Sequence, residues 1–168
     1  GHHALVDLES AGLMGVVTQN VDDLHDRAHA QVSPRPGFEL IHMHGELLKV
    51  RCQRCGTVVP WHGNLSILDH CTTCGRDNCL RPDIVWFGEM PQRMDLILGA
   101  LQTARIFAAI GTSGQVYPAA GLAQHARRMG ARTIELNLAT SVNSRDFDER
   151  LIGPATVIVP RWVDALCA

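Results

Sequence analysis

The 168-residue chain is 46% apolar and 19% charged, with a formal net charge of −2. This composition is typical of a globular protein and excludes a disordered or collagen-like chain. The length fits one domain with room for a small insert. No cluster of lysine and arginine stands out, which argues against nucleic acid or anionic lipid as a partner. Because the apolar runs are too short for a membrane span and no signal-peptide pattern is present, we expect a soluble cytoplasmic protein.

Helical and extended patterns alternate along the chain. The expected helices cover residues 4–13, 22–30, 94–101 and 119–129. The expected strands cover residues 14–18, 40–44, 106–110, 133–138 and 156–159, and residues 82–89 are apolar and extended. A loop rich in proline and glycine lies at residues 33–37. Alternating strands and helices predict an α/β fold with a Rossmann-like parallel sheet and helices on both faces.

Six cysteines are present, and the spacing of four of them is typical of a metal site. Cys52-x2-Cys55 is followed after 15 residues by Cys71-x2-Cys74, the spacing of a zinc ribbon in which four thiolates bind one ion. A disulfide scaffold is disfavoured by the regular apolar periodicity of the chain. Cys79 leaves an alternative open, in which it replaces Cys71 or Cys74 as a ligand. The predicted domains are a zinc-ribbon module at 50–80, inserted into a sheet domain formed by 1–49 and 81–168.

Two predicted strand ends carry groups suited to a nucleotide. Gly111, Thr112 and Ser113 follow a buried strand and precede a helix, where a parallel sheet exposes backbone N–H groups to phosphates. An ordinary glycine-rich turn is the alternative, and a serine hydrolase is disfavoured because the G-x-S-x-G pattern is incomplete. Residues 18–22 bring together amide and carboxylate groups that suit ribose hydroxyls or a carboxamide, unless they only cap the next helix.

Two further features are candidates for a reaction with a peptide. His44, followed by Gly45, is a candidate general base, because an imidazole titrates close to working pH. A lone histidine is more often a structural residue. The extended segment at residues 82–89 offers an edge on which a peptide adds as a strand, with a further core strand as the alternative.

In this order, TQNVDDLH, HMHGE, the two CxxC pairs, RPDIVWFGE, GTSGQVYPAAG and ELNL resemble the sirtuin family of NAD-dependent protein-lysine deacylases. The resemblance covers residues 2–163. HMHGELLKVRC, VWFGEMP and GTSGQVYPAAG are most similar to the bacterial class III (CobB-type) sirtuins. The resemblance implies an enzyme that consumes NAD as a co-substrate and holds a structural zinc ion.

The resemblance also implies a role for each matching residue, with His44 as the general base. The residues implied to bind NAD are Gln19, Asn20, Val21, Asp22, Gly111, Thr112, Ser113, Asn137, Leu138, Ala139 and Ala155. The residues implied to hold the acyl-lysine peptide are Val85, Trp86, Phe87, Gly88 and Glu89. The implied zinc ligands are Cys52, Cys55, Cys71 and Cys74, which lie away from the chemistry.

The mechanism implied by the resemblance is acyl transfer without any movement of hydride. The acyl oxygen of the substrate attacks C1′ of the nicotinamide ribose, and nicotinamide leaves. His44 then removes a proton from a ribose hydroxyl, so that the 2′-oxygen attacks the resulting imidate. The implied products are free lysine, nicotinamide and O-acyl-ADP-ribose. The implied partners are acyl-lysine proteins or peptides, and we expect the full-length protein to be a monomer.

The sequence departs from the family pattern at two places. The Gly-Ala-Gly phosphate loop and the Phe-Arg segment have no counterpart, so we expect the first β-α unit to lie upstream of Gly1. The Tyr and Arg that favour succinyl and malonyl groups belong to the same stretch. We therefore expect the 168 residues to be a fragment that is poorly soluble or inactive by itself. Ala139 stands where relatives often carry an acidic residue, which weakens a ribose contact without affecting the base.

Two other functions fit parts of the sequence. A zinc-stabilised module that binds peptide without turnover would keep the peptide-binding segment and lack the phosphate loop. A zinc ribbon that binds nucleic acid is disfavoured by the net charge of −2 and by the presence of a single lysine, Lys49.

Overall fold

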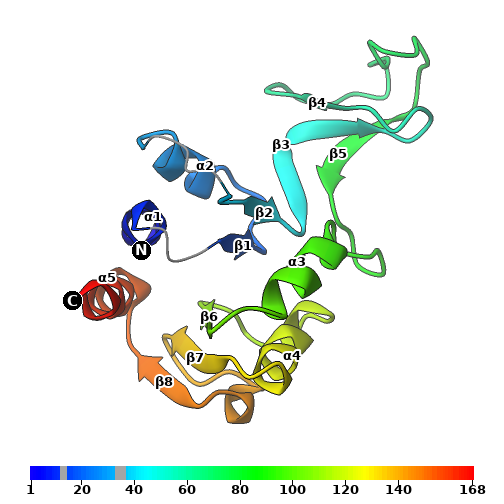
Figure 1. The fold of residues 1–168 in the computed structure, drawn as a ribbon. Coiled ribbons are helices and arrows are strands. Elements are labelled where there is room, and N and C mark those ends of the chain that lie inside the picture. The colour runs from blue at the N-terminus through cyan, green and yellow to red at the C-terminus, as the bar shows by residue number, and fades with distance from the viewer. Residues whose placement is uncertain (12–14, 33–36) are drawn as a thin grey trace. The chain divides into compact units, whose positions relative to one another are not determined.

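A computed structural model describes residues 1–11, 15–32 and 37–168 (Figure 1). The chain divides into two compact units. The first unit contains Gly1–Gly15, Val32–Phe38 and Arg93–Ala168, and the second contains Val16–Gln31 and Glu39–Gln92. None of the helices in the described ranges is both long and apolar enough to cross a membrane.

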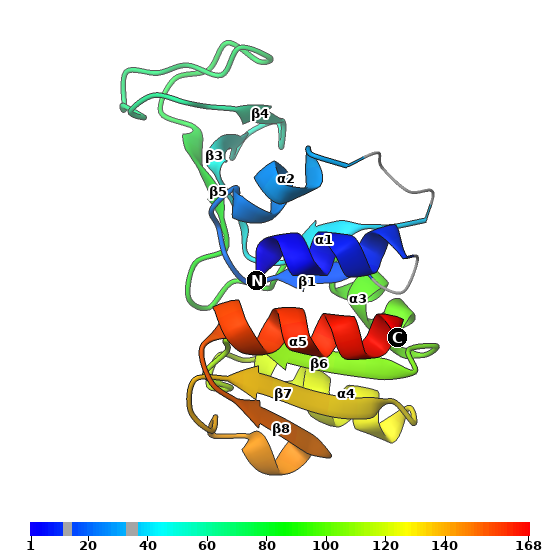
Figure 2. The ribbon, with the colours of Figure 1, turned by 90° about the vertical axis from the view of Figure 1, so that its left-hand side faces the viewer.

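The first unit is built on a parallel sheet of three strands. Their order is β6-β7-β8, with β6 at Ile106–Ile110, β7 at Arg132–Asn137 and β8 at Glu149–Ile152. Helix α5 (Ala155–Cys167) lies on one side of the central strand β7, and α4 (Leu122–Arg128) lies on the other (Figure 2). Four consecutive residues of β7 are buried, as expected for a parallel strand covered on both faces.

One face of β7 packs on helices α5 and α1 (His2–Ser10). The core on this face contains Leu5, Leu8, Ile134, Leu136, Val159, Trp162 and Val163. In β7 the residues of this core alternate with Thr133 and Glu135, because successive side chains of a strand point to opposite faces. Helix α3 (Met94–Leu101) also belongs to the first unit and buries Ile97 and Leu101.

The second unit contains two sheets. Strands β1 (Val16–Thr18) and β2 (Leu40–His42) form a parallel pair, and α2 (Leu24–His29) lies between them in the chain. The other sheet is antiparallel, in the order β4-β3-β5, with β3 at Gly45–Cys52, β4 at Val58–Pro60 and β5 at Leu80–Ile84. The β3–β5 ladder runs from Gly45, opposite Ile84, to Cys52, opposite Leu80, with one register shift between Glu46 and Val50.

Most of the predicted elements coincide with observed ones. The helix at 94–101 is α3 and the strand at 106–110 is β6. The helix at 119–129 begins as a short 3₁₀ turn, Ala119–Gly121, and continues as α4. The strand at 40–44 is shorter than predicted, because β2 ends at His42 and His44 lies in a turn. Residues 12–14 and 33–36, where the first predicted helix ends and the predicted loop lies, are outside the described residues.

The observed strands differ from the predicted ones in several places, and β3 and β4 were not predicted as strands. Residues 156–159 form the start of helix α5, not a strand. The β-branched run favours a strand locally, but burial of Val159, Trp162 and Val163 on one helical face outweighs that preference. Strand β8 was not predicted, because it contains two charged residues in four. The extended segment at 82–89 ends with β5 at Ile84, and a turn follows.

The core of the first unit gives a direct test of the packing. Leu136 is 0% exposed, so replacing it with alanine should lower the free energy of unfolding by about 2–5 kcal/mol through lost contacts and a cavity. Val142 is 71% exposed, and Val142→Ala should change it by less than about 0.5 kcal/mol. Urea denaturation followed by far-UV circular dichroism measures both values. Equal losses for the two variants would contradict the described core.

Candidate functional site

His44 lies in the turn between β2 and β3 and is half-buried. Its Nδ1 is 3.1 Å from the backbone carbonyl oxygen of Gln19. A carbonyl oxygen only accepts hydrogen bonds, so Nδ1 is the donor in this contact and carries the proton. In the neutral ring the other nitrogen, Nε2, then has a lone pair that can accept a proton. The turn therefore leaves His44 with a nitrogen that can accept a proton, as the predicted general base requires.

Backbone hydrogen bonds hold the polar segment at residues 19–22 against the His44 turn. The carbonyl of Thr18 accepts from the N–H of Met43 at 3.0 Å, and the carbonyl of Val21 accepts from the N–H of Leu47 at 2.8 Å. The side chains of the predicted residues Asn20 and Asp22 are exposed, and Gln19 is partly buried. This arrangement brings four of the residues that the resemblance implies for NAD binding beside the predicted base.

Asp22 also has a local role. Its Oδ1 accepts a hydrogen bond of 3.1 Å from the backbone N–H of Leu24, the first residue of α2. This contact is the capping arrangement that the sequence left open as an alternative for residues 18–22. The second carboxylate oxygen is on an exposed residue, so capping and ligand binding are compatible at Asp22.

Gly45 allows a very close approach between β3 and β5. Its φ is +82°, and a Cβ built there would lie 2.0 Å from the backbone oxygen of Asp83. No side chain fits at this distance. The pairing continues past the strand, because the N–H of Val85 donates to the carbonyl of His44 at 2.8 Å. The start of the predicted peptide-binding segment is thus attached directly to the residue that carries the predicted base.

Residues 85–89 form a turn rather than the extended edge that the sequence predicts. The N–H of Glu89 donates to the carbonyl of Trp86 at 2.9 Å, and Gly88 has a φ of +89°. A positive φ is readily adopted by glycine, and it reverses the chain here. The turn leaves Trp86 54% exposed and Phe87 101% exposed, which is unusual for aromatic side chains.

The other predicted NAD-binding residues lie in the first unit, at the carboxyl ends of β6 and β7. The N–H of Gly111 donates to the carbonyl of Leu136, and Asn137 Nδ2 donates to the carbonyl of Thr112 at 2.7 Å. The carbonyl of Asn137 accepts from the N–H of Gly153, just before α5. Ligands of parallel sheets bind outside the carboxyl ends of the strands. The structure therefore gathers this second group where a nucleotide is expected.

The side chains around this strand end are mostly open to solvent. Ser113, Ala139 and Ala155 are exposed, and Leu138 is 71% exposed. Ala155, which the resemblance implies for NAD binding, is the first residue of α5. His44, residues 19–22 and residues 85–89 belong to the second unit.

Glu135 is a functional candidate that sequence reasoning missed. It is 1% exposed in β7, where Oε1 accepts from the N–H of Ser141 at 2.7 Å and Oε2 accepts from Ser144 Oγ. Burial alone would raise the pKa of Glu135, but the hydrogen bonds from these two serines outweigh it and lower the pKa. The buried carboxylate thereby shapes the loop that follows Asn137. The available signal was an acidic residue between Ile134 and Leu136, the two apolar residues of the strand.

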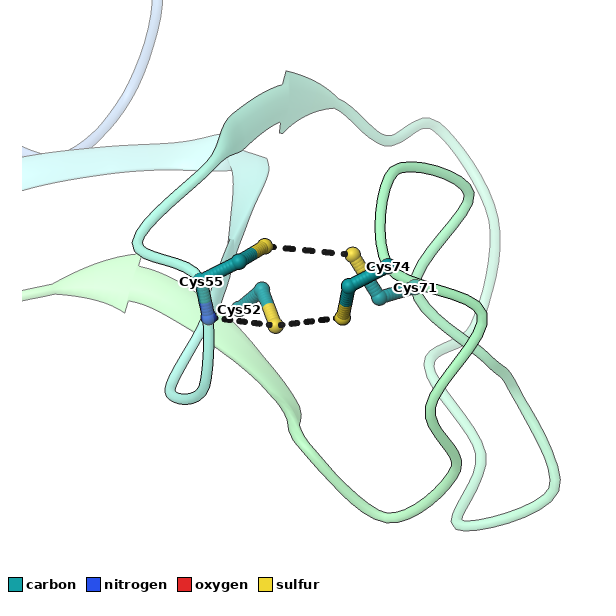
Figure 3. Close-up of side chains that lie close together, drawn as sticks. All are labelled: Cys52, Cys55, Cys71 and Cys74. Atoms are coloured by element: carbon teal, nitrogen blue, oxygen red, sulfur yellow. Dashed lines mark hydrogen bonds between the residues drawn. The ribbon is translucent and has the colours of Figure 1, made fainter.

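Four cysteine sulfurs cluster at the far end of β3 (Figure 3). The Sγ atoms of Cys52 and Cys74 are 3.8 Å apart, and those of Cys55 and Cys71 are 3.7 Å apart. Four thiolates about 2.3 Å from a tetrahedral zinc ion would be separated by about 3.8 Å. Within the described residues these sulfurs all lie within 4.8 Å of one another, so they fit a closed zinc site.

Backbone N–H groups stabilise the thiolate form of Cys52. The N–H of Cys55 lies 3.5 Å from Cys52 Sγ, and the N–H of Arg54 lies 3.4 Å from it. These hydrogen bonds, that of Cys55 foremost, lower the pKa of Cys52 to about 6. The thiolate is the form that binds a metal.

Cys79 lies beside this cluster without belonging to it. Its Sγ is 3.5 Å from Cys52 Sγ and donates to the carbonyl of Arg76 at 3.0 Å. The side chain is buried, and its thiol hydrogen is already used in the bond to Arg76. The geometry therefore favours Cys71 and Cys74 over Cys79 as members of the ligand set.

A second group of potential ligands is formed by Asp26, His42 and Glu46. His42 Nε2 lies 3.1 Å from Asp26 Oδ2, and Glu46 Oε2 accepts from Lys49 Nζ at 2.6 Å. Ion pairing accounts for these contacts, and we assign no metal to this group.

Comparison with known proteins identifies the family. Residues 1–118 match the sequence model of the Sir2 family. The chain belongs to the Sir2 family. A Caulobacter vibrioides member named NAD-dependent protein deacylase is 47% identical, over 99% of this chain and 69% of the relative. A Salmonella typhimurium member of the same name is 49% identical, over 97% of this chain and 58% of the relative. The chain therefore spans 58–69% of the length of these curated Sir2 relatives.

Solved Sir2 structures share the fold. A Sir2 homologue in complex with NAD superposes with a TM-score of 0.84 and 33% identity, covering 99% of this chain and 63% of that protein. A Sir2 protein bound to a myristoylated histone peptide has a TM-score of 0.74 and 29% identity, covering 97% of this chain and 69% of that protein.

The close approach at Gly45 predicts a large effect of a single methyl group. Gly45→Ala should lower the free energy of unfolding by at least about 3 kcal/mol, because β5 must move and the backbone is strained. Gly130 also has a positive φ, of +94°, but open space around it, so Gly130→Ala should cost only about 1–2 kcal/mol. Denaturant unfolding of both variants isolates the effect of the contact. A similar loss in both would contradict the tight packing of β3 on β5.

The cysteine geometry predicts how zinc content responds to substitution. Cys55→Ser and Cys74→Ser should each remove most of the bound zinc, because each takes away one of four thiolates. Cys79→Ser should retain about one zinc per chain, and Cys167→Ser, far from the cluster in sequence, is the control. Elemental analysis of the purified proteins measures the ratio. Loss of zinc in Cys79→Ser with retention in Cys74→Ser would reverse the assignment.

Proposed function

We propose that this protein is an NAD-dependent protein deacylase that removes acyl groups from lysine side chains. The observation that carries the proposal is the state of His44, whose Nδ1 is held by Gln19 so that Nε2 can accept a proton. Val85, at the start of the proposed peptide-binding turn, is hydrogen-bonded to the backbone of the same histidine. The names of the bacterial relatives support this activity.

NAD is the proposed co-substrate. The residues that would hold it are Gln19, Asn20, Val21, Asp22, Gly111, Thr112, Ser113, Asn137, Leu138, Ala139 and Ala155. In the second unit, the polar groups that follow β1 suit ribose hydroxyls or a carboxamide. In the first unit, the polar groups that follow β6 and β7 suit phosphates and a ribose. When bound, NAD supplies the ribose carbon that receives the acyl oxygen and the nicotinamide that leaves.

The base and the peptide segment have separate tasks in the proposed reaction. His44 Nε2 accepts a proton from a ribose hydroxyl, and the carbonyl of Gln19 stabilises the imidazolium that results, through Nδ1–H. Residues 85–89 hold the acyl-lysine peptide next to this base, and the exposed ring of Phe87 offers apolar contact. A Sir2 neighbour bound to a myristoylated histone peptide supports an acylated peptide as the substrate class.

Zinc has a structural task in this proposal. Cys52, Cys55, Cys71 and Cys74 form a closed set of four thiolates with no open position for substrate. The zinc module would comprise residues 50–80, and residues 1–49 and 81–168 would form the Rossmann-like NAD-binding part. The ion would hold the end of the β3–β5 ladder that is remote from His44.

The decisive test is NAD-dependent deacylation of acetyl- and succinyl-lysine peptides. We expect nicotinamide release and deacylated peptide from the longest natural form of the protein, and a decrease of at least about 100-fold in His44→Ala, which lacks the base. His62→Ala is the matched control, because His62 is an exposed histidine of the zinc module. Mass spectrometry of the peptide and chromatography of nicotinamide measure both products.

Two results would contradict the proposal. Full activity in His44→Ala would exclude this histidine as the base. Peptide binding without any release of nicotinamide by the folded, zinc-loaded protein would exclude the enzyme and favour a peptide-binding module.

A further inference from the structure

Both carboxylate oxygens of Glu89 are engaged by groups of the same chain. Oε1 accepts from Arg81 Nη1 at 2.5 Å, and Oε2 accepts from Arg81 Nη2 at 2.9 Å. Oε2 also accepts from the backbone N–H of Trp86 at 2.9 Å. Two parallel bonds between guanidinium and carboxylate form the bidentate pair that is the most directional ion pair in proteins. Both oxygens of Glu89 are therefore occupied by bonds to Arg81 and to the backbone of Trp86.

Arg81 connects this carboxylate to the end of strand β5. Its Nη2 also donates to the carbonyl of Ile84 at 2.7 Å, and its guanidinium lies 4.7 Å from the centre of the Trp86 ring. A lysine has neither the planar fork nor enough directed donors to make the same set of contacts. One guanidinium therefore contacts the last residue of β5, the ring of Trp86 and the carboxylate of Glu89.

These contacts close residues 85–89 into a small loop with fixed ends. The loop begins at Val85, whose N–H is bonded to the carbonyl of His44, and it ends at Glu89. Phe87, at the tip, is 101% exposed and projects from the loop. Phe87 is therefore free to contact a substrate, whereas Arg81 and Glu89 fix the loop.

We infer that Arg81 and Glu89 are positioning residues for the acyl-lysine substrate, holding residues 85–89 in the conformation that receives it. This inference rests on the proposed deacylase function and changes the expected role of Glu89 from a peptide contact to a support. A loop that is ordered before binding avoids the entropic cost of ordering it in the complex. The pair should therefore affect peptide binding and leave the chemical step unchanged.

The charge of the pair persists over the working pH range. The guanidinium of Arg81 and the N–H of Trp86 lower the pKa of Glu89 to about 2. Because the folded pKa is below the ordinary carboxyl value, this stabilisation is complete above that value and is lost only as pH falls toward 2. Any change of peptide KM between pH 6 and pH 8 must then come from other groups.

Steady-state kinetics of Glu89→Gln and Arg81→Lys test the inference in the longest natural form of the protein. Glu89→Gln keeps the size of the side chain and removes its charge, and we expect about a tenfold higher peptide KM. The values of kcat and of KM for NAD should stay within about twofold. Arg81→Lys should raise peptide KM at least as much, because lysine lacks the planar fork that makes these contacts. Glu149→Gln, which breaks the exposed Arg132–Glu149 pair of the first unit, is the control and should change none of these constants.

Amide hydrogen exchange and peptide binding distinguish failure of the positioning role from failure of the proposed deacylase function. Exchange at Trp86 and Glu89 should be faster in Glu89→Gln; faster exchange with an unchanged peptide KM would overturn the positioning role. A lower kcat at constant KM would overturn it as well. If the unmodified protein releases no nicotinamide, the proposed function fails, and fluorescence anisotropy with a labelled acetyl-lysine peptide decides the inference. Equal peptide affinity in the unmodified protein and Glu89→Gln, or no binding by either, would then overturn it.

Discussion

The close pairing of β3 with β5 is the constraint on which the second unit depends. At one end Gly45 lies opposite Ile84 and follows the predicted base, and at the other Cys52 lies opposite Leu80 and belongs to the thiolate cluster. The same two strands therefore join the predicted base, the start of the predicted peptide-binding segment and a member of the thiolate cluster. A zinc ion bound at one end of the ladder would restrain the two strands that hold the His44 turn at the other end, so a metal without an open position could still support the proposed function.

The β3–β5 ladder also buries the carboxylate of Asp83, which is paired with an arginine of the neighbouring strand. Asp83 is 5% exposed and lies beside the close approach at Gly45. Arg51, on the paired strand, donates to Asp83 Oδ1 at 2.7 Å. A buried carboxylate without a partner would carry a large desolvation cost, so the pairing register and the ion pair depend on each other. A slip of one residue would separate Arg51 from Asp83 and also turn every side chain of the strand to the other face.

Features with local causes could be predicted from the sequence, and features with distant partners could not. The cysteine spacing reflects the geometry of two zinc knuckles, and the structure gathers the four predicted sulfurs. Polar residues at strand ends were predictable because parallel strands present these ends at one edge. The run at 156–159 has local strand preference, but contacts with distant residues make it helical. The engagement of Glu89 by Arg81 depends on a turn that the apolar pattern of 82–89 does not reveal.

In each of the two units, a carboxylate that accepts backbone hydrogen bonds shapes a loop, but the two carboxylates lie in different surroundings. In each, a carboxylate with a lowered pKa accepts hydrogen bonds from the backbone of a loop: Glu135 from Ser141, and Glu89 from Trp86. Glu135 lies within a buried strand, where neutral donors have little competition from water. Glu89 lies in an exposed turn, where water competes with each hydrogen bond, and a bidentate guanidinium supplies the extra strength and direction. The dependence of this turn on Arg81 thus follows from its exposure, which the proposed peptide-binding role would also require.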